Sequence, residues 1–336
     1  MKLYLQNGFL NQEEILKKAQ ENNCAFIIEI GARQVGKTYG TLQLMLRQKE
    51  KFIFMRRTQT ECDFITNGAV NPFFPIDPNI YIKKETKYTG GIYNANEEQI
   101  GITMALSTVA KIRGFSGAEY KYLVYDEFIP ESHITKIKNE SDAFFNAIIT
   151  INGNREIQNK PPLITWLLAN SNNLGSPILA GLNIIDKIES MIQKNQEYSI
   201  LNGRGILIIL PRSNELMKEK KKDSIIKAIG EDSKFVSMAY GNEFSYNDNE
   251  NVTTKPIQEY YLLLSVRGQF AIYKHKSKDE LYITDYKNAK VIIEDNERTK
   301  ALLLKKFPSL KAYFIQGRTY FNSLRIKEVY KNIVIN

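Results

Sequence analysis

The stretch Gly31–Thr38, which reads GARQVGKT, constrains this chain more than any other part of its sequence. It has the pattern G-x-x-x-x-G-K-T, it follows the apolar run CAFIIEI, and it precedes YGTLQLMLRQK, in which apolar residues recur at helical spacing. A strand, a glycine-bounded loop and a helix in this order are typical of a loop that holds phosphate groups at a helix N-terminus. We therefore expect an α/β layer fold around a nucleotide site.

Each position of this loop has an expected role. Gly31 and Gly36 permit the backbone turn, Lys37 reaches phosphate oxygens as a point charge, and the Thr38 hydroxyl coordinates Mg²⁺. The backbone N–H groups that face the phosphates come from the whole loop, which also includes Ala32, Arg33, Gln34 and Val35. The pattern does not require Arg33, so we expect it either to make a second phosphate contact or to face a neighbouring subunit.

A phosphate loop of this kind needs a carboxylate at the end of another strand, and KYLVYDEF supplies one. Residues 122–125 form the expected strand, and Asp126 at its carboxyl end would hold Mg²⁺. Glu127 follows directly and can orient or deprotonate an attacking water. The acid pair favours ATP hydrolysis coupled to motion.

Short apolar runs alternate with helical patterns over the first two thirds of the chain, which predicts a mainly parallel sheet covered on both faces. The expected strands are Ala25–Ile30, Phe52–Arg56, Tyr122–Tyr125, Leu163–Ala169 and Gly205–Leu210, with helices that include Tyr39–Lys51 and Asp142–Thr150. The segment from Tyr81 to Ala105 reads instead as an antiparallel hairpin inserted into this sheet.

The 336 residues fit two domains better than one. We expect an ATPase domain over residues 1–211, a charged helical linker over 212–255 and a small α+β domain over 256–336. Three strands with turns at Arg267-Gly268 and around Ser277–Asp279 predict an antiparallel meander in the last domain. A helix over Asn322–Ile333 is expected to close the chain.

Other polar residues are candidates with two readings each. Asn170 ends an expected strand and would sense the γ-phosphate or simply begin a turn. Arg155 is expected on the active-site side, where it would act on a neighbouring subunit's nucleotide, or at the surface beside Glu156. Arg56, Arg57 and Arg113 would contact a subunit, phosphate or DNA, or be solvated loop charges.

The charge is uneven along the chain. The net formal charge is +9, and from Lys300 to the end there are eight Lys or Arg against one acid, Glu328. This indicates an anionic partner such as nucleic acid, or else a solubilising face. The candidate contacts are Lys218, Lys220, Lys221 and Lys222 in the linker and Lys305, Lys306, Lys311, Arg318, Arg325 and Lys327 in the tail. The tail aromatics Phe307, Tyr313, Phe314, Tyr320 and Phe321 are expected to be mostly core.

Targeting and redox signals are weak. Cys24 and Cys62 have no metal-ligand spacing, and neither a signal-length apolar segment nor a run of membrane-spanning length is present. We expect a soluble cytoplasmic protein with no membrane partner.

Over almost its whole length the chain resembles the genome-packaging (encapsidation) ATPases of small protein-primed tailed bacteriophages of the phi-twenty-nine type. The resemblance rests on the motifs IGARQVGKT, FIFMRRTQTE, YLVYDEFIPE, NRE and LLANSNN, and on the closing GRTYFNSLRIKEVYKNI. That family belongs to the ring ATPases with an additional strand and a conserved glutamate (ASCE), and it is related to the large terminases.

The resemblance implies a homomeric ring, expected to be a pentamer, that docks on the procapsid portal in the host bacterial cytoplasm and moves double-stranded DNA with ATP and Mg²⁺. Lys37 and Thr38 match the family's phosphate-loop residues, and Asp126 and Glu127 match its metal ligand and catalytic glutamate. The family pattern R-N-R-E has two arginines, and this chain reads Gly153-Asn154-Arg155-Glu156, so the resemblance leaves Arg155 as the candidate arginine that acts in trans. Some relatives use a structural RNA at the portal, and the sequence does not show whether this chain does.

The last domain would resemble an RNase H-like nuclease that has lost its acids. Its expected first strand, YYLLLSVRG, contains no Asp or Glu, and Asp285 alone would not support metal-dependent cleavage. The competing hypotheses are a nuclease-competent terminase or a helicase, and a nucleotide-binding adaptor without turnover. The Asp126–Glu127 pair disfavours the adaptor.

Overall fold

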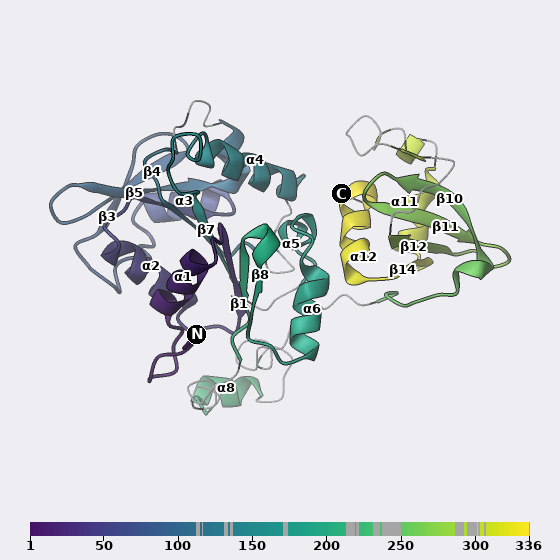
Figure 1. Cartoon of the computed structure of the whole chain (residues 1–336), viewed down its shortest axis with the longest axis horizontal. Helices are drawn as coiled ribbons and strands as arrows, with labels where there is room; N and C mark the ends of the chain where they lie inside the picture. The colour runs from purple at the N-terminus through teal and green to yellow at the C-terminus, as the bar shows by residue number, and fades with distance from the viewer. Residues whose placement is uncertain are drawn as a thin grey trace. The chain divides into compact units, whose positions relative to one another are not determined.

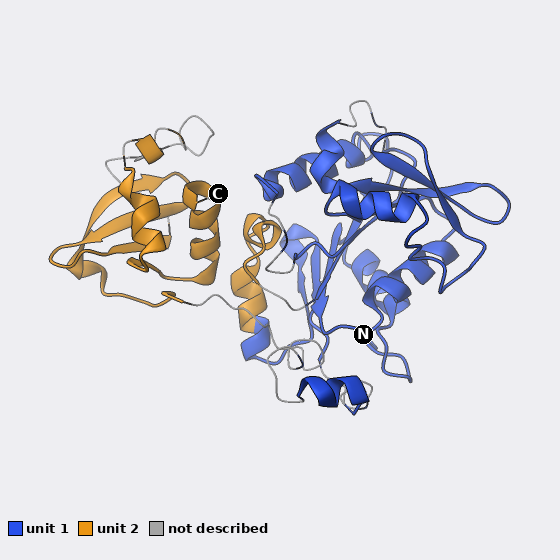
Figure 2. Cartoon of the chain, turned by 180° about the vertical axis from the view of Figure 1, so that it is seen from behind, with its two compact units in different colours: residues 1–172, 191–245 blue, residues 173–190, 246–336 orange. Residues whose placement is uncertain are grey.

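The computed structural model describes the chain except for residues 112–114, 116, 131–133, 135–136, 171–173, 213–218, 220–221, 231–235, 237–249, 286–291, 294–300, 302, 306 and 336. It divides into two compact units, which Figure 2 colours separately. The first comprises Met1–Asn172 and Met191–Ser245, and the second comprises Asn173–Ser190 and Tyr246–Asn336.

In the described part of the first unit, nine strands form one sheet in the order β3-β4-β5-β2-β6-β7-β1-β9-β8 (Figure 1). Their bounds are β1 Phe26–Gly31, β2 Phe52–Arg56, β3 Tyr81–Lys84, β4 Thr89–Tyr93, β5 Gln99–Ala105, β6 Tyr122–Asp126, β7 Ile164–Asn170, β8 Tyr198–Leu201 and β9 Ile206–Ile209. The six central strands from β5 to β9 are parallel, and β3, β4 and β8 are antiparallel to their neighbours. The predicted mainly parallel sheet is confirmed.

The strand order places a row of polar groups along one edge of the sheet. Carboxyl ends of parallel strands meet at the same edge, so the ends of β2, β6, β7 and β1 lie side by side. In spatial order these ends carry Arg56, Asp126, Asn170 and Gly31. β7 separates the phosphate-loop strand β1 from the acid-bearing strand β6.

Helices cover both faces of this sheet (Figure 1). Helices α1 (Gln12–Glu21) and α2 (Lys37–Arg47) bury Ile15, Leu16 and Met45 in one apolar cluster with alternate strand residues such as Phe54 and Trp166. On the opposite face, Phe144 of α4 (Glu140–Asn152) packs against Tyr125 with ring centroids 5.8 Å apart. Alternate side chains of each central strand therefore meet helices on different faces, as expected for a buried parallel sheet.

The segment predicted as an inserted hairpin contains three strands. β4 and β5 form the antiparallel hairpin, β3 pairs with the outer edge of β4, and β5 joins the parallel sheet beside β2. Helix α3 (Gln59–Thr66) follows β2 and contacts this region. Tyr81 and Tyr93 stack across β3 and β4 with ring centroids 5.4 Å apart.

The second unit has its own sheet, in the order β13-β10-β11-β12-β14 among the described residues. The predicted meander is confirmed as β10 (Tyr260–Val266), β11 (Phe270–His275) and β12 (Leu281–Asp285). The strands β13 (Ile292–Ile293) and β14 (Thr319–Phe321) add in parallel at its two sides. Residues of the helices α11 (Ser309–Ile315) and α12 (Leu324–Tyr330) share an apolar cluster with this sheet.

The two units do not coincide with the predicted domains, because residues 173–190 group with the C-terminal part of the chain. This segment contains α5 (Pro177–Gly181) and most of α6 (Ile185–Gln193). Asp186 pairs with Arg325 at 3.3 Å, and a Cβ at Gly175 would lie 2.6 Å from Cδ of Glu328. Of the predicted linker, the structure describes α8 (Ser224–Ile229) and groups it with the first unit.

Candidate active site

The phosphate loop has the backbone that its glycines were expected to allow. β1 ends at Gly31 and α2 begins at Lys37. Gly36, the N-cap of α2, has φ +87°, and a Cβ there would also lie 3.1 Å from Cδ1 of Phe9. Because Gly36 offers no side-chain cap, the first N–H groups of α2 can donate to a phosphate.

Lys37 is held inside the loop by oxygen acceptors. Its Nζ donates to the carbonyls of Gly31 (3.0 Å) and Ala32 (2.5 Å) and to Oδ1 of Asn170 (3.3 Å). Burial lowers the pKa of Lys37 to about 8, while the charges of Glu29 and Asp126 oppose that shift. Asn170 therefore lies within the phosphate site, as one of its two readings required, and its role as a γ-phosphate sensor stays a prediction.

Thr38 and Asp126 come together as the predicted metal ligands. The Thr38 hydroxyl on α2 donates to Oδ1 of Asp126 at 2.8 Å, although β7 lies between their strands β1 and β6. Asp126 is buried, and burial raises its pKa while the Arg56 charge opposes the shift. A hydroxyl and a carboxylate in contact fit Mg²⁺, which takes hard oxygen ligands and is commonly bound by one carboxylate with substrate phosphates.

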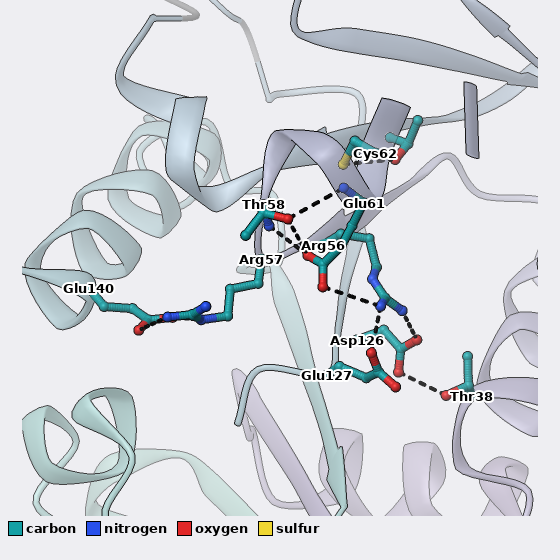
Figure 3. A network of polar contacts seen from close by, with 10 residues as sticks. Thr38, Arg56, Arg57, Thr58, Glu61, Cys62, Asp126, Glu127 and Glu140 are labelled. Atoms are coloured by element: carbon teal, nitrogen blue, oxygen red, sulfur yellow. Dashed lines mark hydrogen bonds and ion pairs between the residues drawn. The ribbon is translucent and has the colours of Figure 1, made fainter. Parts of the chain in front are cut away.

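Arg56 joins the two acids, a role that the sequence reading left open (Figure 3). Its Nη1 lies 2.8 Å from Oδ2 of Asp126, and its Nη2 lies 2.6 Å from Oε2 of Glu127. The same Nη2 is 3.6 Å from Glu61, which closes a capping box with Thr58 at the start of α3. The sequence shows only that Arg56 ends an expected strand; that this strand pairs directly with the Asp126 strand is a tertiary contact.

Arg57 points away from the acids and is not a solvated loop charge. Its Nε and Nη2 donate to the two carboxylate oxygens of Glu140 at 2.6 and 3.0 Å. Both side chains are about 2% exposed. Arg57 is the first residue after β2, and its side chain points away from the side of the chain that carries Arg56 (Figure 3).

The predicted placement of Arg155 on the active-site side is wrong. Its guanidinium donates to the carbonyls of Pro161 (2.8 Å), Ala118 (3.2 Å) and Tyr120 (2.7 Å). These carbonyls precede β7 and β6, so Arg155 lies at the amino-terminal edge of the sheet, opposite the phosphate loop. It is 5% exposed, which also excludes the alternative of a surface arginine. The NRE motif directly follows helix α4, and the sequence alone does not show at which edge of the sheet this helix ends.

Arg33 lies near the phosphate loop lysine. Its charge contributes to the lowered pKa of Lys37, after the larger effect of burial. This proximity is compatible with both readings of Arg33, which stay predictions. Arg113 falls outside the described residues.

A groove beside the phosphate site was not predicted from the sequence. The phosphate pocket itself, about 180 Å³, is lined by Lys37, Thr38, Asp126, Glu127 and Asn170 among others. A larger groove of about 700 Å³ shares its lining residues Gln34, Gly36 and Tyr39. The rest of its wall comes from α2, from the start of α1 with Gln12, and from the segment before α1 with Leu5, Phe9 and Leu10. In the sequence, this groove corresponds only to apolar residues of the N-terminal segment, such as Leu5 and Phe9, and no motif marks it.

Several basic residues of the tail form ion pairs or hydrogen bonds with other residues of the second unit. Arg318 pairs with Asp279 at 2.6 Å, Arg325 pairs with Asp285, and the buried Lys327 donates to the carbonyl of Glu250 at 2.7 Å. The expectation that most tail aromatics are core is confirmed. Phe321 is a buried member of the main apolar cluster, Phe307, Tyr313 and Phe314 are partly buried and pack against it, and Tyr320 is partly buried and packs against a second cluster. Lys218, Lys220, Lys221 and Lys306 lie outside the described residues.

Fold and site together define a class. A phosphate-loop sequence after β1, an Asp-Glu pair at the end of β6 and one additional strand between β1 and β6 are the features of the P-loop ATPase fold of the additional-strand type. Within the described residues, no helix is both long and apolar enough to cross a membrane.

Comparison with known proteins then gives the family. Residues 6–330 match the model of the podovirus DNA encapsidation protein (Gp16), and the chain belongs to that family. It is therefore a protein of viral DNA packaging. A search of the curated proteins found no match to this chain.

Two solved structures share the fold over nearly the whole chain. The Phi-28 gp11 DNA packaging motor is 19% identical, with a TM-score of 0.68 over 95% of this chain and 97% of its own. The bacteriophage Phi-29 genome packaging motor assembly is 16% identical, with a TM-score of 0.60 over 97% of this chain and 99% of its own. At these identities the likeness concerns the fold.

Proposed function

We propose that this chain hydrolyses ATP with Mg²⁺ and uses the energy to move double-stranded DNA through a portal into a preformed procapsid. The observation that carries the proposal is the connected group Thr38–Asp126–Arg56–Glu127 beside the phosphate loop. It brings the metal ligands and a candidate base to one pocket with Lys37. Family membership supplies the packaging role.

The residues divide the work as follows. Lys37 and the first N–H groups of α2 bind the β- and γ-phosphates, and Thr38 and Asp126 would hold Mg²⁺, which neutralises charge on the phosphates. Glu127 orients the attacking water and accepts its proton. In this structure Glu127 pairs with Arg56, so its carboxylate has to break this ion pair, or use its second oxygen, before it can accept a proton from water.

The groove next to the phosphate pocket fits the rest of the nucleotide. It is continuous with the phosphate site through Gln34, Gly36 and Tyr39, and it is large enough for a base and a ribose. Its apolar wall, with Leu5 and Phe9, suits the faces of a purine. We therefore place the nucleoside between α2 and the segment that precedes α1.

The assembly belongs to the same proposal. The protein acts as a homomeric ring, a pentamer, docked at the portal vertex in the host bacterial cytoplasm. Support comes from the family and from the fold shared with two packaging motors. DNA contacts would come from lysines that face solvent, such as Lys305, because several other basic residues of the tail are paired internally.

The replacement Glu127→Gln tests the mechanism. It keeps the size of the side chain but removes the base, so phosphate release should fall by about 10²- to 10⁴-fold while nucleotide binding is retained. Phosphate release with Mg²⁺ and ATP, with and without DNA, is the measurement, and packaging into purified procapsids is the functional readout.

The matched control is Glu119→Gln, because Glu119 is exposed and pairs with Lys51 away from the site. It should leave turnover unchanged. Undiminished turnover in Glu127→Gln would refute the assigned base. Cleavage of DNA or strand separation by the wild-type protein would favour the nuclease or helicase hypothesis instead.

A further inference from the structure

Glu29 is a buried carboxylate in the middle of β1, two residues before the phosphate loop. It is 0% exposed, and its strand runs between β7 and β9 in the centre of the sheet. A carboxylate in such a position is costly to ionise unless donors and a counter-charge surround it. The activity proposed above assigns it no role.

Hydrogen bonds to Glu29 come from two neutral side chains. Nε1 of Trp166 on β7 donates to Oε1 at 2.9 Å, and Nε2 of Gln12 on α1 donates to Oε2 at 3.1 Å. The other amide atom of Gln12, Oε1, is buried and has no hydrogen-bond partner among the described residues. The amide oxygen and nitrogen of a glutamine can exchange places by rotation, so Gln12 can present an acceptor where it now presents a donor.

The surroundings thus suit both protonation states of Glu29. The carboxylate accepts from Trp166 and Gln12, whereas the neutral acid can keep the Trp166 bond and donate its own proton to Oε1 of a rotated Gln12. Neither state leaves the Glu29 carboxyl group without partners; the rotation pairs the Gln12 oxygen with the acid proton and moves Nε2 to the position that Oε1 occupies now. Burial raises the pKa of Glu29 to about 7, so both states are accessible near neutral pH.

Among the described groups that act on Glu29, Lys37 on α2 is the charged one. The side chains that face Glu29 from α1 and β7 are the neutral Gln12 and Trp166, and its partner on β9 is the apolar Ile209. The Lys37 charge favours the ionised form of Glu29. Lys37 in turn is subject to Asp126, Arg33 and Glu127.

We propose that Glu29 is a positioning residue that takes up a proton from solvent when a nucleotide binds. Bound phosphates draw the Lys37 ammonium toward themselves and add negative charge above the loop, and both effects disfavour a carboxylate at Glu29. The carboxylate becomes a carboxylic acid, and no other bond forms or breaks. The proposal rests on nucleotide binding at this loop, which belongs to the proposed function.

Calorimetric titration of the full-length protein with Mg²⁺ and ADP tests the proposal. Measurement at pH 7 in buffers of different ionisation enthalpy counts the protons taken up, for the wild type, Glu29→Gln and the control Glu119→Gln. The wild type and the control should take up a fraction of a proton, up to one, that Glu29→Gln does not. Linkage then requires wild-type affinity to fall by up to about tenfold per unit as pH rises from 6 to 8, with a smaller fall in the variant.

Glutamine is expected to fit, because it can accept from Trp166 and donate to Oε1 of Gln12. A second variant, Trp166→Phe, removes a donor to the carboxylate and should move proton uptake to higher pH. Equal proton counts for the wild type and Glu29→Gln, even with altered affinity, would overturn the proposal. Absence of nucleotide binding by the wild type would overturn the proposed function as well, so the two failures can be told apart.

Discussion

At the scale of single residues, neighbours in the sequence have separate tasks. Arg56 and Arg57 are adjacent, yet one holds Asp126 and Glu127 and the other holds Glu140 on the far side of β2. The Arg56 pairs neutralise two carboxylates that would otherwise repel each other. The Arg57 pair is remote from phosphate and is better understood as part of the scaffold.

Glu29 predicts an unusual dependence of stability on pH. Its pKa is about 7 in the folded protein against an ordinary 4.5, so the fold favours the neutral acid. The cost of ionising it is absent below about pH 4.5 and complete above about pH 7. Relative to Glu29→Gln, the wild type should lose up to roughly 3 kcal/mol of unfolding free energy between pH 5 and pH 8.

Urea denaturation of both proteins at pH 5, 6, 7 and 8 checks this. The glutamine variant should gain stability relative to the wild type as pH rises, with the smallest pH-dependent contribution at pH 5 and the largest at pH 8. A constant difference across this range would show that Glu29 does not titrate there.

Arg155 is expected to stabilise the first unit rather than to act on a neighbouring subunit. Arg155→Met removes three hydrogen bonds to backbone carbonyls, which should cost roughly 2–5 kcal/mol of unfolding free energy. Below its melting temperature, the variant should still release phosphate at the wild-type rate.

The control for this variant is Lys160→Met, an exposed position in the same loop. A second measurement mixes Arg155→Met with Glu127→Gln subunits. If Arg155→Met alone is folded but inactive, and mixing restores turnover, Arg155 acts across an interface after all.

At the scale of elements, the Arg57–Glu140 pair ties the end of β2 to the first turn of α4. Both carboxylate oxygens are used and both side chains are buried. Replacing one partner leaves an uncompensated charge in the interior, whereas replacing both removes the charge and the penalty together. The net contribution of the pair to stability is therefore expected to be small, although the loss of either partner alone is costly.

A double-mutant cycle tests that view. Glu140→Ala should lower the unfolding free energy by about 3–5 kcal/mol, and Arg57→Met with Glu140→Ala should recover part of the loss. Glu119→Ala, in the exposed pair with Lys51, should cost under about 1 kcal/mol. Urea unfolding of the wild type, Glu140→Ala, Arg57→Met and the double variant gives the coupling energy, and strictly additive losses would contradict a specific pair.

The central strands could be predicted closely from the sequence because each is a continuous apolar run. The predicted strand Phe52–Arg56 has the same bounds as β2. Each of the other four predicted strands overlaps an observed strand, and their ends differ by at most one residue. Helix α2 begins two residues earlier and ends four residues before the predicted Lys51. The side-by-side order of the strands is a tertiary property, and no local pattern shows that β5 pairs with β2.

At the scale of the whole molecule, some residues of the candidate site could be predicted from the sequence and others could not. Lys37, Thr38, Asp126 and Glu127 gather in one pocket as predicted, because a loop pattern and a strand end identify them locally. The bridging role of Arg56, the nucleoside groove and the grouping of residues 173–190 depend on contacts between distant segments. Arg155 was misplaced for the same reason.

The positions of the site residues also depend on the length of each strand, because these residues lie at strand ends. β2 and β6 end level with each other at Arg56 and Asp126, and β1 and β7 end level at Gly31 and Asn170, two residues beyond Asp126 in the β6–β7 register. One residue inserted within any of these strands would turn the following side chains to the opposite face and advance the end by about 3.3 Å. The active site can therefore absorb many exchanges of apolar side chains in these strands, but it cannot absorb a single insertion or deletion.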